Sequence, residues 1–206
     1  MRTVRRAGDG GLLVQTATLD EAHRLHRALL DAAIPGVSDI VPGERTVLVV
    51  ADPDACDLDR LASRVAELEA GAAEAEGAPP VEIPVRYDGA DLAEVAELAG
   101  LTVREVVDRH ASVEYSAAYL GFSPGFGYLT GLDEALHVPR RTTPRTSVPA
   151  GSVAIAGAYT AVYPSPSPGG WRLLGRTSLT MWDVRRDPPS LLRPGLRVRF
   201  VPEWMP

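Results

Sequence analysis

The chain has 206 residues, of which 45% are hydrophobic and 23% charged, and its formal net charge is -6. These values are typical of a globular protein in water, and the sequence lacks a run of about 18 apolar residues that could span a bilayer. The arginines are scattered through an acidic chain without a basic stripe, so we expect neither a membrane nor a nucleic acid as partner.

Three residue types limit the chemistry by their scarcity. The chain has no lysine, which excludes a P-loop lysine, a Schiff-base lysine and a biotinyl-lysine within it. Its single cysteine, Cys56, has no disulfide partner, and its four histidines show no metal-ligand spacing, so we predict no metal in this chain. The first residues lack the apolar run of a secretory signal, and we expect a cytoplasmic protein.

The first 80 residues are predicted to form a small α/β domain. Thr18 and Glu21 make a capping box that opens a helix, Pro35-Gly36 ends it, and Asp57 is the expected N-cap of a second helix. The predicted strands lie at 12–16, 37–41, 46–51 and 81–86. Counting the last strand, the order is β-α-β-β-α-β, which is typical of a ferredoxin-like unit. Residues 71–80 are expected to be a linker or a frayed helix end.

Residues 81–206 are predicted to form a second, β-rich domain. Two short helices come first, one from Asp91 to Gly100 and another that is capped by Thr102 with Glu105 and ends at His110. Short β-like runs follow, separated by loops rich in glycine and proline, a pattern typical of a small barrel or sandwich. The expected strands lie at 113–120, 153–156, 159–163, 172–174, 179–182 and 198–201.

The first segment with features of a binding site is an aromatic loop at 119–129. Its Gly-Phe-Ser-Pro-Gly matches the G-x-S-x-G pattern of a serine nucleophile, but Pro124 and Gly125 disfavour the helix that this pattern requires behind the serine. We therefore interpret the loop as rigid. Its rings, Phe122, Phe126 and Tyr128, either wall an apolar substrate pocket or pack in the core.

A second segment, residues 138–156, places Arg140, Arg141 and Arg145 in a loop stiffened by prolines. Such a cluster can order an anion, and a solvated basic loop is the alternative for each arginine. Ser152 can offer a hydroxyl donor at the entry to the next strand, or it can belong to a simple turn.

A third segment, from Thr160 to Thr177, is a proline-rich connection that holds Trp171 in place. We expect Thr160 and Trp171 to line a binding wall or a partner interface. Among the histidines, His110 ends a helix just before Tyr115, and these two residues are the candidates for proton transfer.

Three long motifs in this half resemble the family of the 5-oxoprolinase B-type subunit, also called KipI or allophanate hydrolase subunit 1. They are Gly121–Leu129, Pro139–Gly157 and Ser167–Thr177, with looser matches in the first half at Gly8–Val14, Ile34–Val37 and Asp39–Pro42. The resemblance therefore covers nearly the whole chain. The sequence departs from the family pattern at Ser123, Gly127 and Ala158-Tyr159.

The resemblance implies an α+β protein with a small α/β domain followed by a cyclophilin-like β-barrel. It also implies two partner proteins, a KipA-like (C-type) subunit and a LamB/YcsF-like (A-type) subunit. Together with this chain they would form an ATP-dependent enzyme that opens 5-oxo-L-proline, a small cyclic amide, to L-glutamate. ATP with magnesium is expected to be bound by the complex, and the isolated chain is expected to be inactive.

The resemblance leaves other activities open. One relative inhibits a sporulation sensor kinase, and related fused proteins use the same domains as the carboxyltransferase part of a biotin-dependent urea carboxylase. The barrel alone also allows a peptidyl-prolyl isomerase, although fold does not imply function. The oxoprolinase subunit is the leading hypothesis, with the aromatic loop and the arginine loop lining a cleft that the partner completes.

Overall fold

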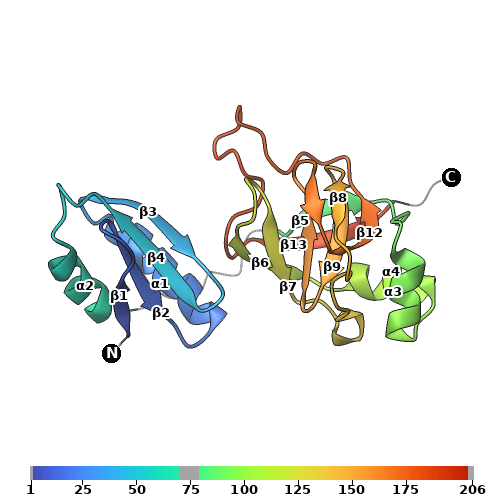
Figure 1. Ribbon diagram of the computed structural model, residues 1–206, viewed down its shortest axis with the longest axis horizontal. Coiled ribbons are helices and arrows are strands. Elements are labelled where there is room, and N and C mark those ends of the chain that lie inside the picture. The colour runs from blue at the N-terminus through green and yellow to red at the C-terminus, as the bar shows by residue number, and fades with distance from the viewer. Residues whose placement is uncertain (1, 70–78, 204–206) are drawn as a thin grey trace. The chain divides into compact units, whose positions relative to one another are not determined.

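The computed structural model describes residues 2–69 and 79–203 of the chain. The chain divides into two compact units, residues 1–77 and 78–206, and each is described by itself (Figure 1). The first unit is a four-stranded sheet with two helices. The second is a barrel-like sheet with two helices and a short 3₁₀ helix, as counted over the described residues.

The first unit is an antiparallel sheet covered by helices. Its strands are β1 (Val4–Arg6), β2 (Gly11–Gln15), β3 (Val37–Pro42) and β4 (Thr46–Ala51), and its helices are α1 (Leu19–Ala32) and α2 (Leu58–Glu67). The strand order in the sheet is β1-β2-β4-β3. Leu25 of α1 and Val65 of α2 share one buried cluster with Val14 and Val49 of the sheet. Burial of these apolar side chains stabilises the unit.

The predicted N-caps of both helices in this unit are confirmed, although Glu21 accepts from the residue before Thr18 and does not complete the predicted capping box. The Thr18 hydroxyl accepts a hydrogen bond from the Glu21 N–H at 3.1 Å, and the Glu21 carboxylate accepts one from the Ala17 N–H at 2.8 Å. The Asp57 carboxylate accepts from two N–H groups in the first turn of α2 at 2.9 and 3.2 Å. These acceptors satisfy N–H groups that have no carbonyl partner within the helix.

The predicted order of strands in this unit is wrong at one position. The strand predicted at 81–86 is β5 (Val81–Val85), which pairs in parallel with β13 (Arg197–Pro202) of the second unit. The edge strand that pairs with β2 in the first unit is β1, which was not predicted. Because β1 has a single apolar residue, its sequence carries no strand signal. The ferredoxin-like classification remains a prediction, and most of the linker predicted at 71–80 lies outside the described residues.

The second unit is built on seven further strands. Besides β5 and β13 these are β6 (Tyr115–Leu120), β7 (Gly127–Thr130), β9 (Ser152–Ala156), β10 (Tyr159–Val162) and β12 (Arg172–Arg176). Their order in the sheet is β12-β9-β10-β7-β6-β13-β5. A separate two-stranded ribbon consists of β8 (Arg145–Val148) and β11 (Ser167–Gly169). The run predicted at 179–182 forms no strand, because only Trp182 makes a bridge, to Ser190.

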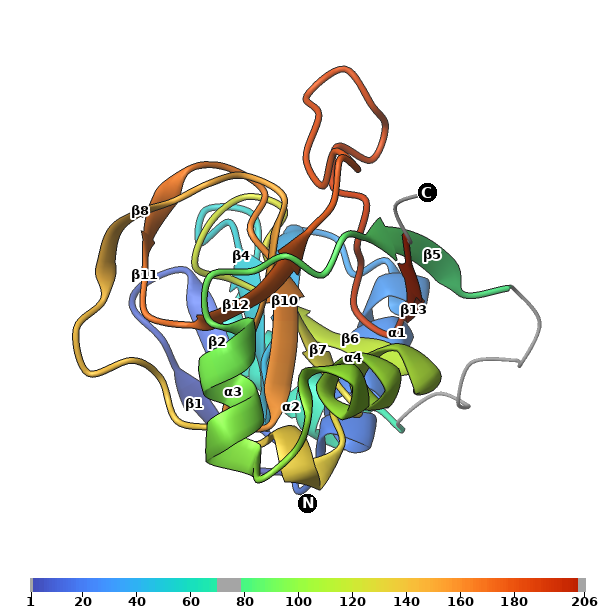
Figure 2. The ribbon, with the colours of Figure 1, turned by 90° about the vertical axis from the view of Figure 1, so that its right-hand side faces the viewer.

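The helices of the second unit are α3 (Leu92–Ala99) and α4 (Val103–Ser112), with a 3₁₀ helix η1 (Glu134–Leu136). Figure 1 and Figure 2 both show α3 and α4 next to each other. The α3 helix contacts β12, and α4 contacts β13. The capping box predicted for α4, from Thr102 and Glu105, is present.

The two edge strands of the large sheet meet at a reciprocal bridge. The Arg86 N–H donates to the Arg176 carbonyl, and the Arg176 N–H donates to the Arg86 carbonyl, each at 2.9 Å. This bridge joins the end of β5 to the end of β12, so the sheet curls into a nearly closed barrel.

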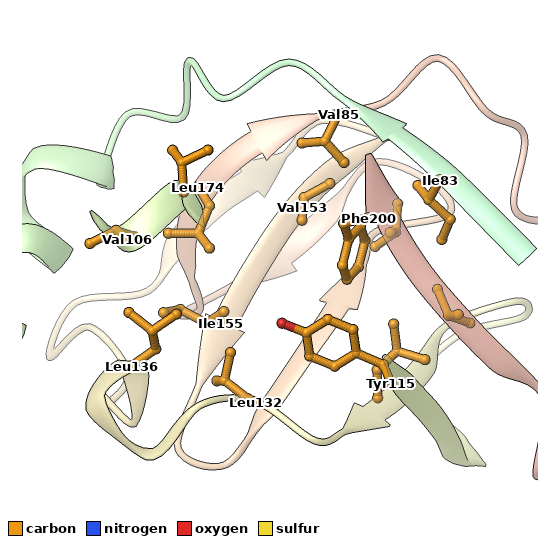
Figure 3. Packing of buried hydrophobic residues seen from close by; sticks show 14 of the residues in the cluster. Ile83, Val85, Val106, Tyr115, Leu132, Leu136, Val153, Ile155, Leu174 and Phe200 are labelled. Atoms are coloured by element: carbon orange, nitrogen blue, oxygen red, sulfur yellow. The ribbon is translucent and has the colours of Figure 1, made fainter. Parts of the chain in front are cut away.

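The barrel interior is a packed apolar core. Figure 3 shows Tyr115 and Phe200 among the side chains of this cluster, together with Leu132 and Ile155. Tyr115 and Phe200 are each 1% exposed, and their rings lie 5.3 Å apart at a steep angle. The interior is therefore filled by side chains and offers no open channel.

Replacing Gly175 of β12 by alanine is expected to strain the closing bridge. A Cβ atom there would lie 2.3 Å from the Arg86 carbonyl oxygen, so backbone on one side must shift. We expect the free energy of unfolding of the second unit to fall by about 1–3 kcal/mol, measured by urea denaturation. Gly170→Ala is the matched control, since its Cβ would meet no atom nearer than 3.7 Å. Equal stabilities of the two variants would contradict this prediction.

Candidate functional site

Five aromatic rings of the second unit form what we call the aromatic cluster. They come from the loop after β6, from β7, from the residue after β10 and from the residue before β12: Phe122, Phe126, Tyr128, Tyr163 and Trp171. The Phe126 ring is central, with its centroid 5.6 Å from Trp171, 5.3 Å from Tyr163 and 5.2 Å from Tyr128. All three contacts are edge-to-face, which fixes the rings relative to one another.

The loop before β7 turns sharply instead of starting a helix. The Ser123 N–H donates to the Gly121 carbonyl at 2.8 Å, and the Phe126 N–H donates to the Ser123 carbonyl at 3.0 Å. This geometry excludes the nucleophile elbow of a serine hydrolase. Phe122 has a φ of 67°, which is strained for a residue with a side chain, and it is 61% exposed. The loop therefore presents one aromatic ring to solvent.

Two of the predicted arginines are bound to a buried carboxylate, Asp91. One Asp91 oxygen accepts hydrogen bonds from Arg141 Nη1 at 2.9 Å and Arg145 Nη2 at 2.7 Å, and the other accepts from the Leu173 N–H at 2.8 Å. Asp91 is 1% exposed. Burial opposes its charge, but the hydrogen bonds from Arg145 and Leu173 outweigh burial and hold the pKa of the carboxyl below its usual value.

A second carboxylate, Glu94 of α3, extends this network. It pairs with Arg172 Nη1 at 2.6 Å and with Arg141 Nη1 at 3.5 Å. The Arg172 Nε also donates to the Pro139 carbonyl at 2.9 Å. The charged groups of β12 and α3 thus hold the start of residues 139–148, which we call the arginine segment.

Arg140, the third predicted arginine, lies in a different setting. Its guanidinium carbon is 5.9 Å from the centroid of the Trp171 ring, in a cation–π arrangement. Burial raises the pKa of the nearby Tyr163 phenol, while a hydrogen bond from the Trp171 backbone and the charges of Arg140 and Arg145 lower it in part. Positive charge and aromatic surface therefore adjoin each other at this face.

The predicted proton carrier His110 is completely buried in the barrel core. Its Nδ1 lies 2.7 Å from the Tyr87 hydroxyl and its Nε2 lies 2.9 Å from the Thr160 hydroxyl. Because the Thr160 hydroxyl donates to the Ala154 carbonyl at 3.1 Å, it accepts from Nε2–H, and Tyr87 donates to Nδ1. Burial lowers the pKa of His110 to about 3, so its ring stays neutral.

Tyr115 is equally enclosed, and its hydroxyl donates to the His110 carbonyl at 2.8 Å. Burial raises its pKa far above the usual value. Catalytic roles for His110 and Tyr115 do not fit these surroundings, and neither does ligand contact by the buried Thr160. Ser152 donates to the Pro149 carbonyl at 2.8 Å, so its side chain belongs to the turn.

The structure therefore brings together part of the predicted set. Phe122, Phe126 and Tyr128 meet Trp171 and Arg140 in one place, with Pro124 and Gly125 in the connecting turn. Sequence reasoning missed Asp91 and Tyr163. Asp91 shows only the signal of a helix start, and its arginine partners lie 50 and 54 residues further along the chain.

The described residues contain no group of three or more His, Cys, Asp or Glu side chains that could hold a metal ion. A hollow of about 540 Å³ lies over Tyr87 and Val107, and another of about 350 Å³ adjoins Ser152 and Gly175. Over the same described parts, no helix is long and apolar enough to cross a membrane.

Several known proteins are similar to this chain in sequence. The family model for the carboxyltransferase domain, subdomain C and D, matches residues 2–192. The chain is 46% identical over 198 residues to the B-type subunit of 5-oxoprolinase from Escherichia coli O157:H7, a match that covers 92% of this chain and 88% of that protein. It is 49% identical over 124 residues to the B-type subunit of 5-oxoprolinase from Bacillus subtilis (strain 168), and this match covers 59% of this chain and 52% of that protein.

Solved structures share the fold. TTHA0988 matches with a TM-score of 0.86 and 40% identity over 99% of this chain. The K. lactis urea amidolyase matches with a TM-score of 0.73 and 22% identity over 98% of this chain, which shows a common fold alone. The chain spans only 41% of the TTHA0988 chain and 15% of the urea amidolyase chain.

Replacing His110 by glutamine is expected to change the pH dependence of stability. Because the folded-state pKa lies below that of an unfolded histidine, at about 6.5, unfolding takes up a proton as the pH falls from 6.5 toward 3. The free energy of unfolding of the second unit should therefore decrease as the pH decreases, by up to about 1.4 kcal/mol per pH unit. His110→Gln should remove this dependence on pH.

Urea denaturation between about pH 5 and pH 7 measures this slope above the titration range of most carboxyl groups. His26→Gln is the control, because burial also lowers the pKa of His26 and this residue belongs to the first unit. The assignment of the pH dependence to His110 would be contradicted if His110→Gln left the pH dependence of the second unit intact and His26→Gln removed it.

Proposed function

The chain belongs to the family of the 5-oxoprolinase B-type subunit, and from this premise we propose that it is that subunit in an ATP-dependent complex that opens 5-oxo-L-proline to L-glutamate. The observation that carries the proposal is the 46% identity to the E. coli protein over 92% of this chain. We propose a KipA-like (C-type) subunit and a LamB/YcsF-like (A-type) subunit as its partners. The word subunit in the names of the relatives supports an assembly of several chains.

The candidate site supports a role in binding more than in bond cleavage. The two predicted proton carriers, His110 and Tyr115, are buried in the barrel core and engaged in hydrogen bonds there. The aromatic loop lacks the geometry of a serine nucleophile. A chain of this kind can bind and orient a substrate and exclude water, while groups of other subunits complete the reaction. We therefore expect the isolated chain to be inactive.

The face formed by the aromatic cluster and the arginine segment suits a small cyclic amide that carries a carboxylate. Four arginines and two carboxylates meet there, which leaves an excess of positive charge in a chain whose net charge is -6. This local excess attracts an anion. Of the aromatic cluster, Phe126, Tyr163 and Trp171 are buried. Phe122 is 61% exposed and Tyr128 is half-buried, so these two rings can offer apolar contact to a five-membered lactam ring.

The described residues do not fit a nucleotide site of their own. The chain has no lysine to pair with phosphates, and the described residues hold no carboxylate cluster for a magnesium ion. We therefore place ATP on another subunit of the complex and assign to this chain no step in the activation of the amide.

Omission of this chain from the assembled complex tests the proposal. Glutamate formation from 5-oxo-L-proline and ATP is measured with the chain and both candidate partner subunits, and again with each protein left out. We expect activity from the three proteins together and a loss of at least about 100-fold without this chain, because its part of the site is then missing. Activity that persists at full rate without the chain would rule the proposal out.

A second candidate function is favoured by the description of the family model, which names a carboxyltransferase domain. As the chain has no lysine, biotin would have to arrive on another protein. Avidin added to the assembled complex distinguishes the two functions. Loss of activity with avidin would favour carboxyl transfer, whereas an unchanged rate is expected for the oxoprolinase.

A further inference from the structure

We propose that the three arginines of the arginine segment have different roles: Arg140 binds the carboxylate of the substrate, and Asp91 is a positioning residue that holds Arg141 and Arg145 as its support. The inference rests on the proposed function and deepens it. The sequence left these three arginines equivalent, and their surroundings in the structure separate them.

Asp91 is placed to organise the segment and not its own helix. It stands at the N-cap position of α3, where an aspartate side chain usually accepts an N–H of the first turn, but it makes no capping hydrogen bond. Its two oxygens instead accept from Arg141, Arg145 and the Leu173 N–H. Because this buried carboxylate accepts from two guanidinium groups instead of capping the helix, it fixes the positions of both guanidiniums.

The backbone on each side of Arg140 is also anchored. The Pro139 carbonyl accepts from Arg172 Nε at 2.9 Å, and the Arg141 N–H donates to the Gly170 carbonyl at 2.8 Å. Both anchors lead to residues that flank Trp171. The main chain of Arg140 is therefore held beside the ring over which its guanidinium lies.

The guanidinium of Arg140 is available to bind a ligand, whereas those of Arg141 and Arg145 are held by Asp91. Arg140 is exposed, and among residues 2–69 and 79–203 no carboxylate is paired with it. A guanidinium held over an indole ring keeps its N–H groups available at the edge, in the fork geometry that matches a carboxylate. Arg141 and Arg145 each donate a hydrogen bond to Asp91.

The ligand chemistry is a small oxyanion, which 5-oxoproline supplies as a carboxylate and ATP supplies as phosphate. We assign the carboxylate, because the half-buried ring of Tyr128, 5.7 Å from that of Trp171, and the exposed ring of Phe122 can provide the apolar contact that a lactam ring needs. Kinetics with each substrate varied in turn separate the two sources.

The test compares five variants in the assembled complex: Arg140→Gln, Arg140→Lys, Arg141→Gln, Asp91→Asn and Asp133→Asn. We expect Arg140→Gln to raise the KM for 5-oxoproline by about 10- to 100-fold with little change in kcat or in the KM for ATP, because a charge-assisted contact is lost. Arg140→Lys should fall between this variant and the original, since it keeps the charge without the fork. Arg141→Gln should change the same KM by no more than about threefold.

Asp91→Asn should raise the KM for 5-oxoproline by about 5- to 50-fold, because the arginine segment loses its anchor. Asp133→Asn is the matched control. The Asp133 carboxylate likewise pairs with an arginine, Arg109, at 2.7 Å and accepts from a backbone N–H, that of Ala135, at 2.9 Å. The Asp133→Asn variant should lose similar contacts without a change in the KM for 5-oxoproline.

The inference is overturned if Arg140→Gln leaves the KM for 5-oxoproline unchanged, if Arg141→Gln matches its effect, or if only the KM for ATP rises. Arg140 is exposed, so this variant should fold even if Asp91→Asn does not, and thermal melting of each isolated variant checks this. An inactive complex with the original chain would refute the proposed function instead, so the two failures are distinguishable.

Discussion

The buried carboxylate of Asp91 is the interaction on which the arrangement of the candidate site depends. A charge in an apolar interior costs several kcal/mol unless it is paired and hydrogen-bonded, and here two guanidiniums and one backbone N–H fulfil that condition. The start of α3, the arginine segment and β12 are thereby held at one point. Trp171 directly precedes β12, so the position of its ring in the aromatic cluster depends in part on the same charge.

The barrel core also holds a series of three polar side chains, Tyr87, His110 and Thr160, which form hydrogen bonds with one another. Each side chain donates one hydrogen bond to the next, and the last donates to a backbone carbonyl. Such a buried series selects one packing arrangement, because any other leaves polar atoms unpaired. The second unit therefore has an apolar core that contains one neutral polar series, and an exterior at which Arg140 and Phe122 are exposed. The exterior is the part that a substrate can reach.

Local signals in the sequence were sufficient where one segment determines its own structure. The caps at Thr18, Asp57 and Thr102 depend on residues two or three positions away, and all three are confirmed. Long-range features were not predicted from the sequence. The pairing of β5 with β13, the place of β1 in the first sheet and the role of Asp91 depend on partners in other segments of the chain. His110 shows the limit, since a histidine at a helix end has the same local sequence whether it is exposed or enclosed.

The parallel pairing of β5 with β13 has a consequence for biosynthesis. These strands are the first and last of the second unit, so β5 leaves the ribosome long before its neighbour exists. Until β13 is made, β5 carries an unpaired edge that another nascent chain could join, and contacts of such long sequence separation form slowly. Once they pair, the chain enters and leaves the unit at the same edge. A domain of this topology can join a longer polypeptide without disturbing its barrel, as in the TTHA0988 chain, of which the matched part is 41%.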